Sequence, residues 1–236
     1  MSWFSSNNTL YRFEMFSASH FVILAVLVLI TFFIFKFRQQ LNDPKWRPIE
    51  IIIALSLLLF EAAFTGWLLV SGNWRPSDSI PLELCSISLI LTFLLLVHGK
   101  KWIYELLLFT ALLGGTQALL TPILSFGFPH FRFFHFFYTH LMMVWVVFYF
   151  TWVKGFHPTI WSVIKVVTFL NVLLPLIMIV NKFVDGNYMF LSHKPNSPSL
   201  LDYLGPYPWY ILSLEGLLIL LSLIVWLLLR KPQKNL

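Results

Sequence analysis

The sequence predicts an all-α membrane protein, a bundle of seven transmembrane helices in one domain that comprises residues 1–236. Hydrophobic residues make up 58% of the chain and charged residues only 11%, which soluble globular domains do not show. Seven apolar stretches are long enough to cross a hydrocarbon core of about 30 Å as helices. They lack the alternating pattern of barrel strands, and backbone groups in lipid must be paired within their own segment, so helices are expected.

The seven predicted spans follow one another along the chain with mostly short connections. They are expected at residues 18–37, 48–71, 80–98, 102–125, 131–153, 158–181 and 208–230. The longest connection, 182–207, mixes Gly, Pro and aromatic residues, which favours a folded lid over a flexible linker.

Two spans contain residues that disturb or tighten helix packing. Gly114-Gly115 in the fourth span permits close approach of neighbouring helices. Thr121-Pro122 in the fourth span and Pro175 in the sixth are expected to kink their helices.

The distribution of basic residues predicts the orientation. With the N-terminus outside, ten Lys and Arg residues fall in the inner loops and tail and five on the outer side. Cytoplasmic loops carry the excess of Lys and Arg, so the N-terminus is expected outside and the C-terminus inside. The net charge of +6 then suits an anionic inner leaflet. Nucleic-acid binding is not predicted, because the sequence has no basic patch interleaved with exposed aromatic residues.

Polar residues inside the predicted spans indicate a site. An ionisable group near the bilayer centre costs about 2.5–3.5 kcal/mol on insertion scales, so such groups usually face the bundle interior. Glu50, Glu105 and Lys165 fall near the cytoplasmic side, where long side chains reach the interface. The remaining groups share one depth in the outer half of the membrane: Glu61, Cys85, Gln117, His140, Asn171 and Glu215. This shared depth favours one buried polar site, and the alternative is that these groups only join helices by hydrogen bonds.

Cys85 is the single cysteine of the chain, which excludes an intrachain disulfide. It stands near the start of the third span, where a helix N-terminus favours a reactive thiolate; the alternative is a small packed side chain. Glu83, two residues before it, is a candidate helix cap and a candidate site residue. His140 is the only deep imidazole, and a base beside a thiol suits nucleophilic acyl chemistry; the alternative is a hydrogen-bonded core histidine.

Two further histidines, His130 and His135, lie in an aromatic run at the predicted interface, where aromatic side chains anchor spans. Anchoring is therefore their expected role. No HxxxH or HExxH pattern is present, so no metal site is predicted.

Several motifs together carry a resemblance to a known family. They are Leu82-Glu-Leu-Cys85, Gln117-Ala-Leu-Leu-Thr-Pro122, His140, Asn187-Tyr188, Lys194-Pro195 and Leu204-Gly-Pro-Tyr-Pro-Trp-Tyr210. Over nearly its whole length the chain resembles the YwaF-type family of bacterial integral membrane proteins, which is related to eukaryotic transmembrane protein 164. The resemblance implies an acyltransferase-like fold in a bacterial cell membrane and phospholipid substrates. It also implies that Cys85 is the nucleophile, that His140 is its histidine, and that Asn187, Tyr188 and Tyr210 are supporting site residues.

The leading hypothesis is therefore a lipid acyltransferase or lipase-like enzyme that needs no soluble cofactor and no metal. Gln117 or Asn171 would hydrogen-bond the oxyanion, and Glu61 or Glu215 would orient the imidazole. The alternative class is a transporter, channel or receptor with a polar solute- or proton-binding site. A structural protein without chemistry is a third class. The oligomeric state stays open.

Overall fold

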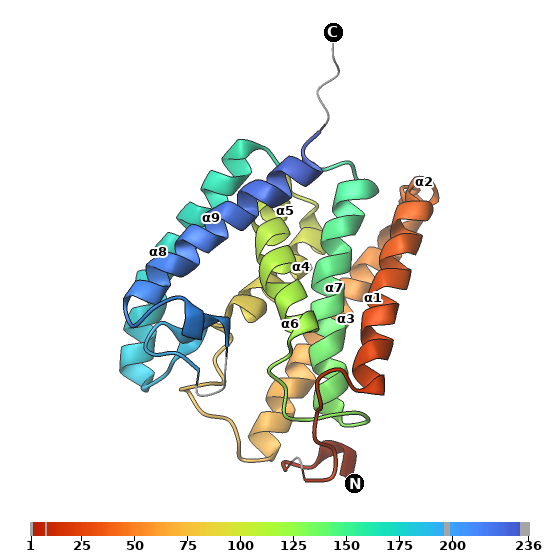
Figure 1. Ribbon diagram of the computed structural model, residues 1–236. Coiled ribbons are helices and arrows are strands. Elements are labelled where there is room, and N and C mark those ends of the chain that lie inside the picture. The colour runs from red at the N-terminus through yellow and green to blue at the C-terminus, as the bar shows by residue number, and fades with distance from the viewer. Residues whose placement is uncertain (1, 8, 196–198, 232–236) are drawn as a thin grey trace.

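Long helices run between two ends of the molecule, and the N-terminal segment and the last turn of the helix labelled α9 lie at opposite ends (Figure 1). We call the end that holds the N-terminal segment the lower end and the other the upper end, as drawn in Figure 1. This computed structural model describes residues 2–7, 9–195 and 199–231. Within these residues the regular structure is helical, with one isolated β-bridge between Arg12 and Phe126. The all-α polytopic fold is thus confirmed.

Six helical stretches of the described chain are long and apolar enough to cross a membrane. Five are or contain single helices: α1 (Ala18–Lys36), α3 (Arg47–Val70), α7 (Phe131–Trp152), α8 (Ile160–Val184) and α9 (Trp209–Leu229). The sixth is composite and consists of α5 (Lys101–Phe109), the π-helical turn η3 (Thr110–Gly115) and α6 (Thr116–Leu120). Short helices complete the described structure: η1 (Ser2–Phe4), α2 (Arg38–Leu41), η2 (Pro44–Trp46), η4 (Tyr188–Phe190) and η5 (Leu200–Tyr203).

The third predicted span is the short one. Helix α4 (Leu84–His98) has 15 residues and is therefore about 22 Å long, less than the hydrocarbon core of about 30 Å. It starts four residues later than predicted, because the chain from 71 to 83 climbs from the lower end into the bundle before the helix begins (Figure 1). Cys85 consequently enters the bundle at some depth rather than at its lower surface.

The fourth span differs from the kinked helix that was expected. Thr121 leaves the helical region, with φ −132° and ψ 69°, so the helix ends before Pro122 instead of bending there. The helix is instead deformed before α6, in the π-helical turn η3. Turns of this kind are frequent at functional sites. In the sixth span, Pro175 lies inside a helix that continues on both sides of it.

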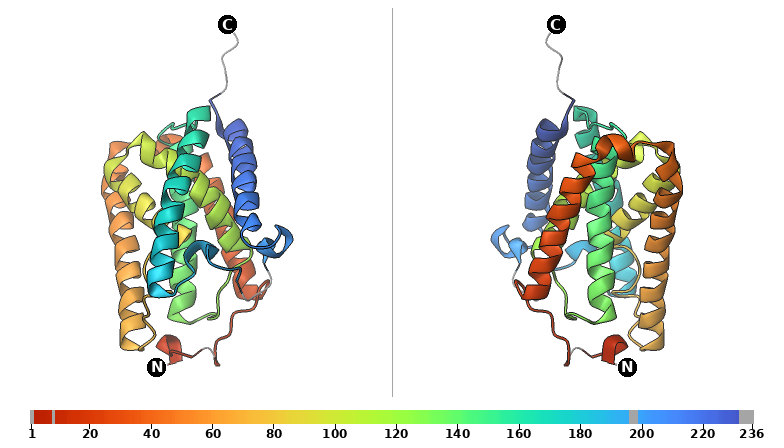
Figure 2. Two further views of the ribbon diagram at one scale, coloured as in Figure 1. Left: turned by 90° about the vertical axis from the view of Figure 1, so that its left-hand side faces the viewer. Right: turned by 90° about the vertical axis from the view of Figure 1, so that its right-hand side faces the viewer.

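The helices differ in how much of their surface is packed. Helix α1 packs on α7 and α9 packs on α8, and α3 and α9 stand on opposite sides of the bundle (Figure 2). The outer faces of these helices expose large apolar side chains such as Val28, Leu59 and Leu228. Such a surface suits lipid rather than water. The main apolar core lies between α4, α5, η3 and α7.

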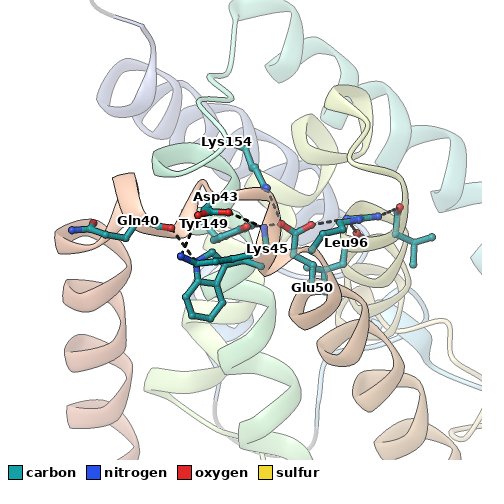
Figure 3. A network of polar contacts seen from close by, with 10 residues as sticks. Gln40, Asp43, Lys45, Glu50, Leu96, Tyr149 and Lys154 are labelled. Atoms are coloured by element: carbon teal, nitrogen blue, oxygen red, sulfur yellow. Dashed lines mark hydrogen bonds and ion pairs between the residues drawn. The ribbon is translucent and has the colours of Figure 1, made fainter.

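A buried ion network joins α3, α4 and α7 at the upper end (Figure 3). Glu50 is 5% exposed, and its carboxylate accepts hydrogen bonds from Arg47 at 2.5 Å, Tyr149 at 2.5 Å and Lys154 at 2.8 Å. Arg47 also donates to the carbonyl of Leu96 at 2.6 Å, near the C-terminus of α4. Glu50 was expected to reach the interface; instead it is buried and paired with two cations.

The expectation that the carboxylate reaches the interface is also wrong for a second residue. Glu105 on α5 is 4% exposed. It pairs with Lys165 on α8 and accepts a hydrogen bond from Ser162 at 3.0 Å. The pair holds α5 against α8, because a buried carboxylate is tolerated only with such partners.

Candidate functional site

Cys85 lies in the first turn of α4, half-buried, at the edge of the main apolar core. Its neighbour Leu84 approaches η3 closely: a Cβ on Gly114 would stand 3.5 Å from Leu84 Cδ2. On the other side of η3, a Cβ on Gly115 would stand 3.5 Å from Val144 Cγ2 of α7. The two adjacent glycines thus let the start of α4 and the middle of α7 pack on one π-helical turn.

Glu83 connects the start of α4 to the lid. It occupies the N-cap position of α4, but its side chain makes no capping hydrogen bond to this helix. Instead, Oε2 accepts a hydrogen bond from the Met189 backbone N–H at 3.1 Å. The carboxylate, two residues before Cys85 in the sequence, therefore ties the lid to the start of α4.

The described part of the connection 182–207 is folded and contains η4 and η5; we call it the lid. Asn187 organises its first turn by accepting from the Ser192 and His193 N–H groups at 3.0 and 3.1 Å. Met189 and Phe190 both have φ +54°, a backbone region that costs non-glycine residues about 1–3 kcal/mol each. Several tertiary contacts hold this strained segment in place.

Tyr188 is the main anchor of the lid. Its ring is buried, and its hydroxyl donates to Pro76 O at 2.7 Å and accepts from Ile80 N–H at 2.8 Å. Asn181 of α8, a residue that the sequence analysis did not single out, binds both the N–H and the carbonyl of Tyr188, at 2.8 and 3.1 Å. The Tyr210 hydroxyl of α9 donates to Phe190 O.

His140 occupies the middle of α7 and is 6% exposed. Its Nδ1 lies 2.7 Å from the carbonyl oxygen of Phe136. A carbonyl only accepts, so Nδ1 carries the proton and Nε2 keeps its lone pair. No hydrogen bond within the described chain engages Nε2, so this imidazole has the tautomer and the open nitrogen that a general base needs.

Glu61 has a different partner from the one expected. Its Oε2 accepts from His135 Nε2–H at 3.1 Å, and His135 Nδ1 accepts from Arg132 Nη1 at 2.7 Å. The Arg132 guanidinium lies 3.9 Å from the centre of the Phe64 ring. Both nitrogens of His135 are occupied, so Glu61 fixes His135 rather than orienting His140. His135 is a buried network residue, and its assignment as an interfacial anchor is wrong.

Two of the expected site residues point away from the interior. Gln117 is exposed and donates to Thr121 Oγ1 at 2.9 Å. Asn171 is exposed and donates to Val167 O, one turn back on its own helix, at 3.0 Å. The expectation that both lie in a buried site is wrong. Glu215 is half-buried on α9. In the part of the chain that the structure describes, no three His, Cys, Asp or Glu side chains are grouped as metal ligands.

The N-terminal segment covers the lower end of α3 and α7 and is held by histidines. His130, directly before α7, is buried; Nε2–H donates to Ser5 O at 2.9 Å and Nδ1 accepts from Arg132 N–H at 3.0 Å. His20 repeats this arrangement, with Nε2–H donating to Leu119 O at 2.9 Å. Both nitrogens of each ring are therefore occupied. His130 is a helix cap and a tether, not the interfacial anchor that was expected.

Acidification should loosen the attachment of residues 3–7. Burial lowers the pKa of His130, against the opposing effect of its bond to the Ser5 carbonyl. A lowered pKa means that the attachment is fully stable above the ordinary histidine value of about 6.5 and weakens as the pH falls below it. The protection factors of residues 3–7, which compare the exchange rate with the intrinsic rate at the same pH, should fall between pH 7.5 and pH 5. In His130→Asn, which keeps a capping side chain but does not titrate, this fall in protection should disappear; an unchanged fall would contradict the assignment.

A comparison with protein families covers most of the chain. Residues 15–226 match the model of the TMEM164 family. The chain belongs to the TMEM164 family. The match includes α1 to α8, the described lid and most of α9, so Cys85 and His140 both lie within it. No curated protein and no solved structure matches the chain.

Proposed function

We propose that this TMEM164-family protein is an intramembrane lipid acyltransferase in which Cys85 is the nucleophile and His140 its proton partner. The observation that carries the proposal is the state of His140: its Nδ1–H is fixed by the Phe136 carbonyl, and its Nε2 is unengaged. A buried histidine that served only packing would be expected to use both nitrogens, as His20, His130 and His135 do.

The first half-reaction forms an acyl-enzyme. Cys85 Sγ gives its proton to His140 Nε2 and attacks the ester carbonyl of a glycerophospholipid. The S–C bond forms, the ester C–O bond breaks, and the leaving glycerol oxygen takes the proton from His140. In the second half-reaction the hydroxyl of another lipid attacks the thioester, its proton passes through His140 to sulfur, and the C–S bond breaks. One ester is exchanged for another without an oxidant or a cofactor.

The start of α4 supplies donors for the oxyanion. No side chain caps this helix, and its first intrahelical bond runs from Ile87 N–H to Glu83 O at 3.0 Å. The preceding N–H groups, those of Leu84, Cys85 and Ser86, have no carbonyl of an earlier turn to bind. Such N–H groups stabilise negative charge that develops beside the nucleophile. This role replaces the one first assigned to Gln117 and Asn171.

The lid and the apolar outer surface suit a lipid substrate. The lid segment from Tyr188 to Leu191 shares an apolar cluster with Ile87, one turn after Leu84 and close to Cys85. A phospholipid that enters from the surrounding membrane keeps its acyl chains in lipid while its ester reaches the start of α4. Membrane phospholipids are therefore the proposed donors and acceptors.

The proposal is tested by acyl transfer in vesicles. The purified protein is placed in vesicles with a phosphatidylethanolamine or phosphatidylglycerol donor that carries a deuterated acyl chain, together with an unlabelled lysophospholipid. Mass spectrometry should find the deuterated chain on the acceptor. Folded protein that transfers no label from either donor would contradict the proposal.

We also propose that the lower end, with the lid and Cys85, faces the outside of a bacterial cell membrane, as the basic residues predict. A cysteine introduced into the 38–47 connection, at the upper end, should react with an impermeant thiol reagent only after the cells are opened. Labelling of intact cells would show that the protein has the opposite orientation.

A further inference from the structure

One carboxylate within the long helices stands apart from the others. Glu50, Glu61 and Glu105 each contact a cationic or hydrogen-bond-donating side chain. Glu215, in the lower half of α9, makes no hydrogen bond or ion pair with any described residue. An ionisable side chain in a membrane-spanning helix usually marks a binding or transport function.

Glu215 lies on the inner face of α9. Exposed residues of this helix recur at 212, 216, 219, 220, 224, 227 and 228, which defines its outward face. Glu215 is only half-exposed and shares the opposite face with Ile211 and Ser222, at the helical spacing of one and two turns. The carboxylate therefore faces the bundle and remains accessible.

Ser222 gives an independent indication on the same face. It is 0% exposed, and its Oγ has no hydrogen-bond partner among the described residues. A buried hydroxyl without a partner costs about 1–3 kcal/mol. Two polar side chains seven residues apart on one helical face thus lack protein partners, whereas the rest of that face is apolar.

Residues of α9 on both sides of Glu215 pack in apolar clusters that include residues of α4. Ile211, one turn before Glu215, packs in the cluster of the lid with Ile87 of α4. Leu223, two turns after Glu215, packs on the main core, which Cys85 also contacts. Helix α9 also contacts η3, the turn on which Leu84 packs. Glu215 therefore lies between a stretch of α9 that packs in the cluster of the lid with Ile87 and a stretch that packs on the main core.

We infer that Glu215 binds the free hydroxyl of the lysophospholipid that accepts the acyl chain. A carboxylate is an acceptor-only group and needs a donor, and the second half-reaction needs an alcohol held near the thioester on Cys85. The hydroxyl donates its hydrogen bond to Glu215 until it attacks, and its proton then passes to His140 Nε2. Glu215 forms no covalent bond and is a positioning residue. This inference rests on the proposed acyltransferase function.

Binding of the acceptor can be measured without turnover. The probe is a 1-acyl lysophosphatidylethanolamine whose acyl chain carries a diazirine, added to the purified protein in vesicles. A second probe is its 2-O-methyl ether, which lacks the free hydroxyl.

The wild-type protein should crosslink the hydroxyl probe through α9 at least tenfold more than the ether. Glu215→Gln, which is nearly isosteric, should reduce crosslinking of the hydroxyl probe to the level of the ether. Ser213→Ala is the matched control on α9, because Ser213 bonds only Trp209 O of its own helix, at 3.3 Å.

The possible results separate the inference from the function on which it rests. Equal crosslinking of both probes to the wild-type protein, or unchanged crosslinking in Glu215→Gln, would overturn the assignment. If Glu215→Gln weakened both probes equally, the carboxylate would recognise the ammonium headgroup and the hydroxyl assignment would be wrong. If the expected crosslinking were found but no acyl chain were transferred, the assignment of Glu215 as a lipid-binding residue would stand and the acyltransferase proposal would fail.

Discussion

Replacing Cys85 by serine or alanine should lower acyl transfer by about a thousandfold or more, because residues that act as a catalytic unit lose most of the rate together. His140→Ala should cause a loss of similar size, and the double variant should cost no more than either single change. The measurement is initial transfer rate in vesicles, with thermal stability followed in parallel.

His157→Gln is a control for the loss of an imidazole, since His157 lies at the upper end and bonds Leu229 O at 3.0 Å. Its transfer rate should stay close to that of the unchanged protein. Full activity in Cys85→Ala would show that the cysteine is a packing residue, as the alternative interpretation of the sequence allows.

The second large effect concerns stability rather than catalysis. Glu50→Ala leaves Arg47 and Lys154 without their shared carboxylate at the buried junction of α3, α4 and α7. Removing one partner of a buried ion network costs about 3–5 kcal/mol. The variant should therefore denature at a clearly lower temperature in detergent.

Asp43→Asn is the matched control, because Asp43 pairs with Lys45 at 3.1 Å on the exposed surface nearby. Exposed pairs contribute about 0–1 kcal/mol, so its melting temperature should hardly change. Equal stability losses in Glu50→Ala and Asp43→Asn would show that burial of the network does not determine its strength.

Hydropathy located most of the helices, because the cost of unpaired backbone groups in lipid requires long apolar helices. It misplaced the start of the third span: Ile80 to Leu82 are apolar enough for a span, yet they pack beneath the lid in the cluster of Tyr188. It also did not show the π-helical turn, since the residues of Thr110–Gly115 fit an ordinary helix equally well.

The depth of the polar residues was more predictable than their direction. A helix that is apolar on all sides gives no signal for which face is buried, so Gln117 and Asn171 were assigned inward and prove exposed. Glu61 was expected to contact His140 but contacts His135, one helical turn and a half away. The partner of Glu83 was equally hidden from the sequence, because it is a backbone N–H more than a hundred residues later.

The acyl-enzyme on Cys85 tests the proposed mechanism most directly. The purified protein is mixed with a phospholipid that carries a deuterated acyl chain, without acceptor, quenched in acid and analysed by intact mass and peptide mapping. The mechanism predicts one deuterated acyl group on the peptide containing Cys85, released by neutral hydroxylamine and absent in Cys85→Ser after the same treatment. An acyl group on another residue, or undiminished transfer with the Cys85 thiol blocked by alkylation, would contradict it.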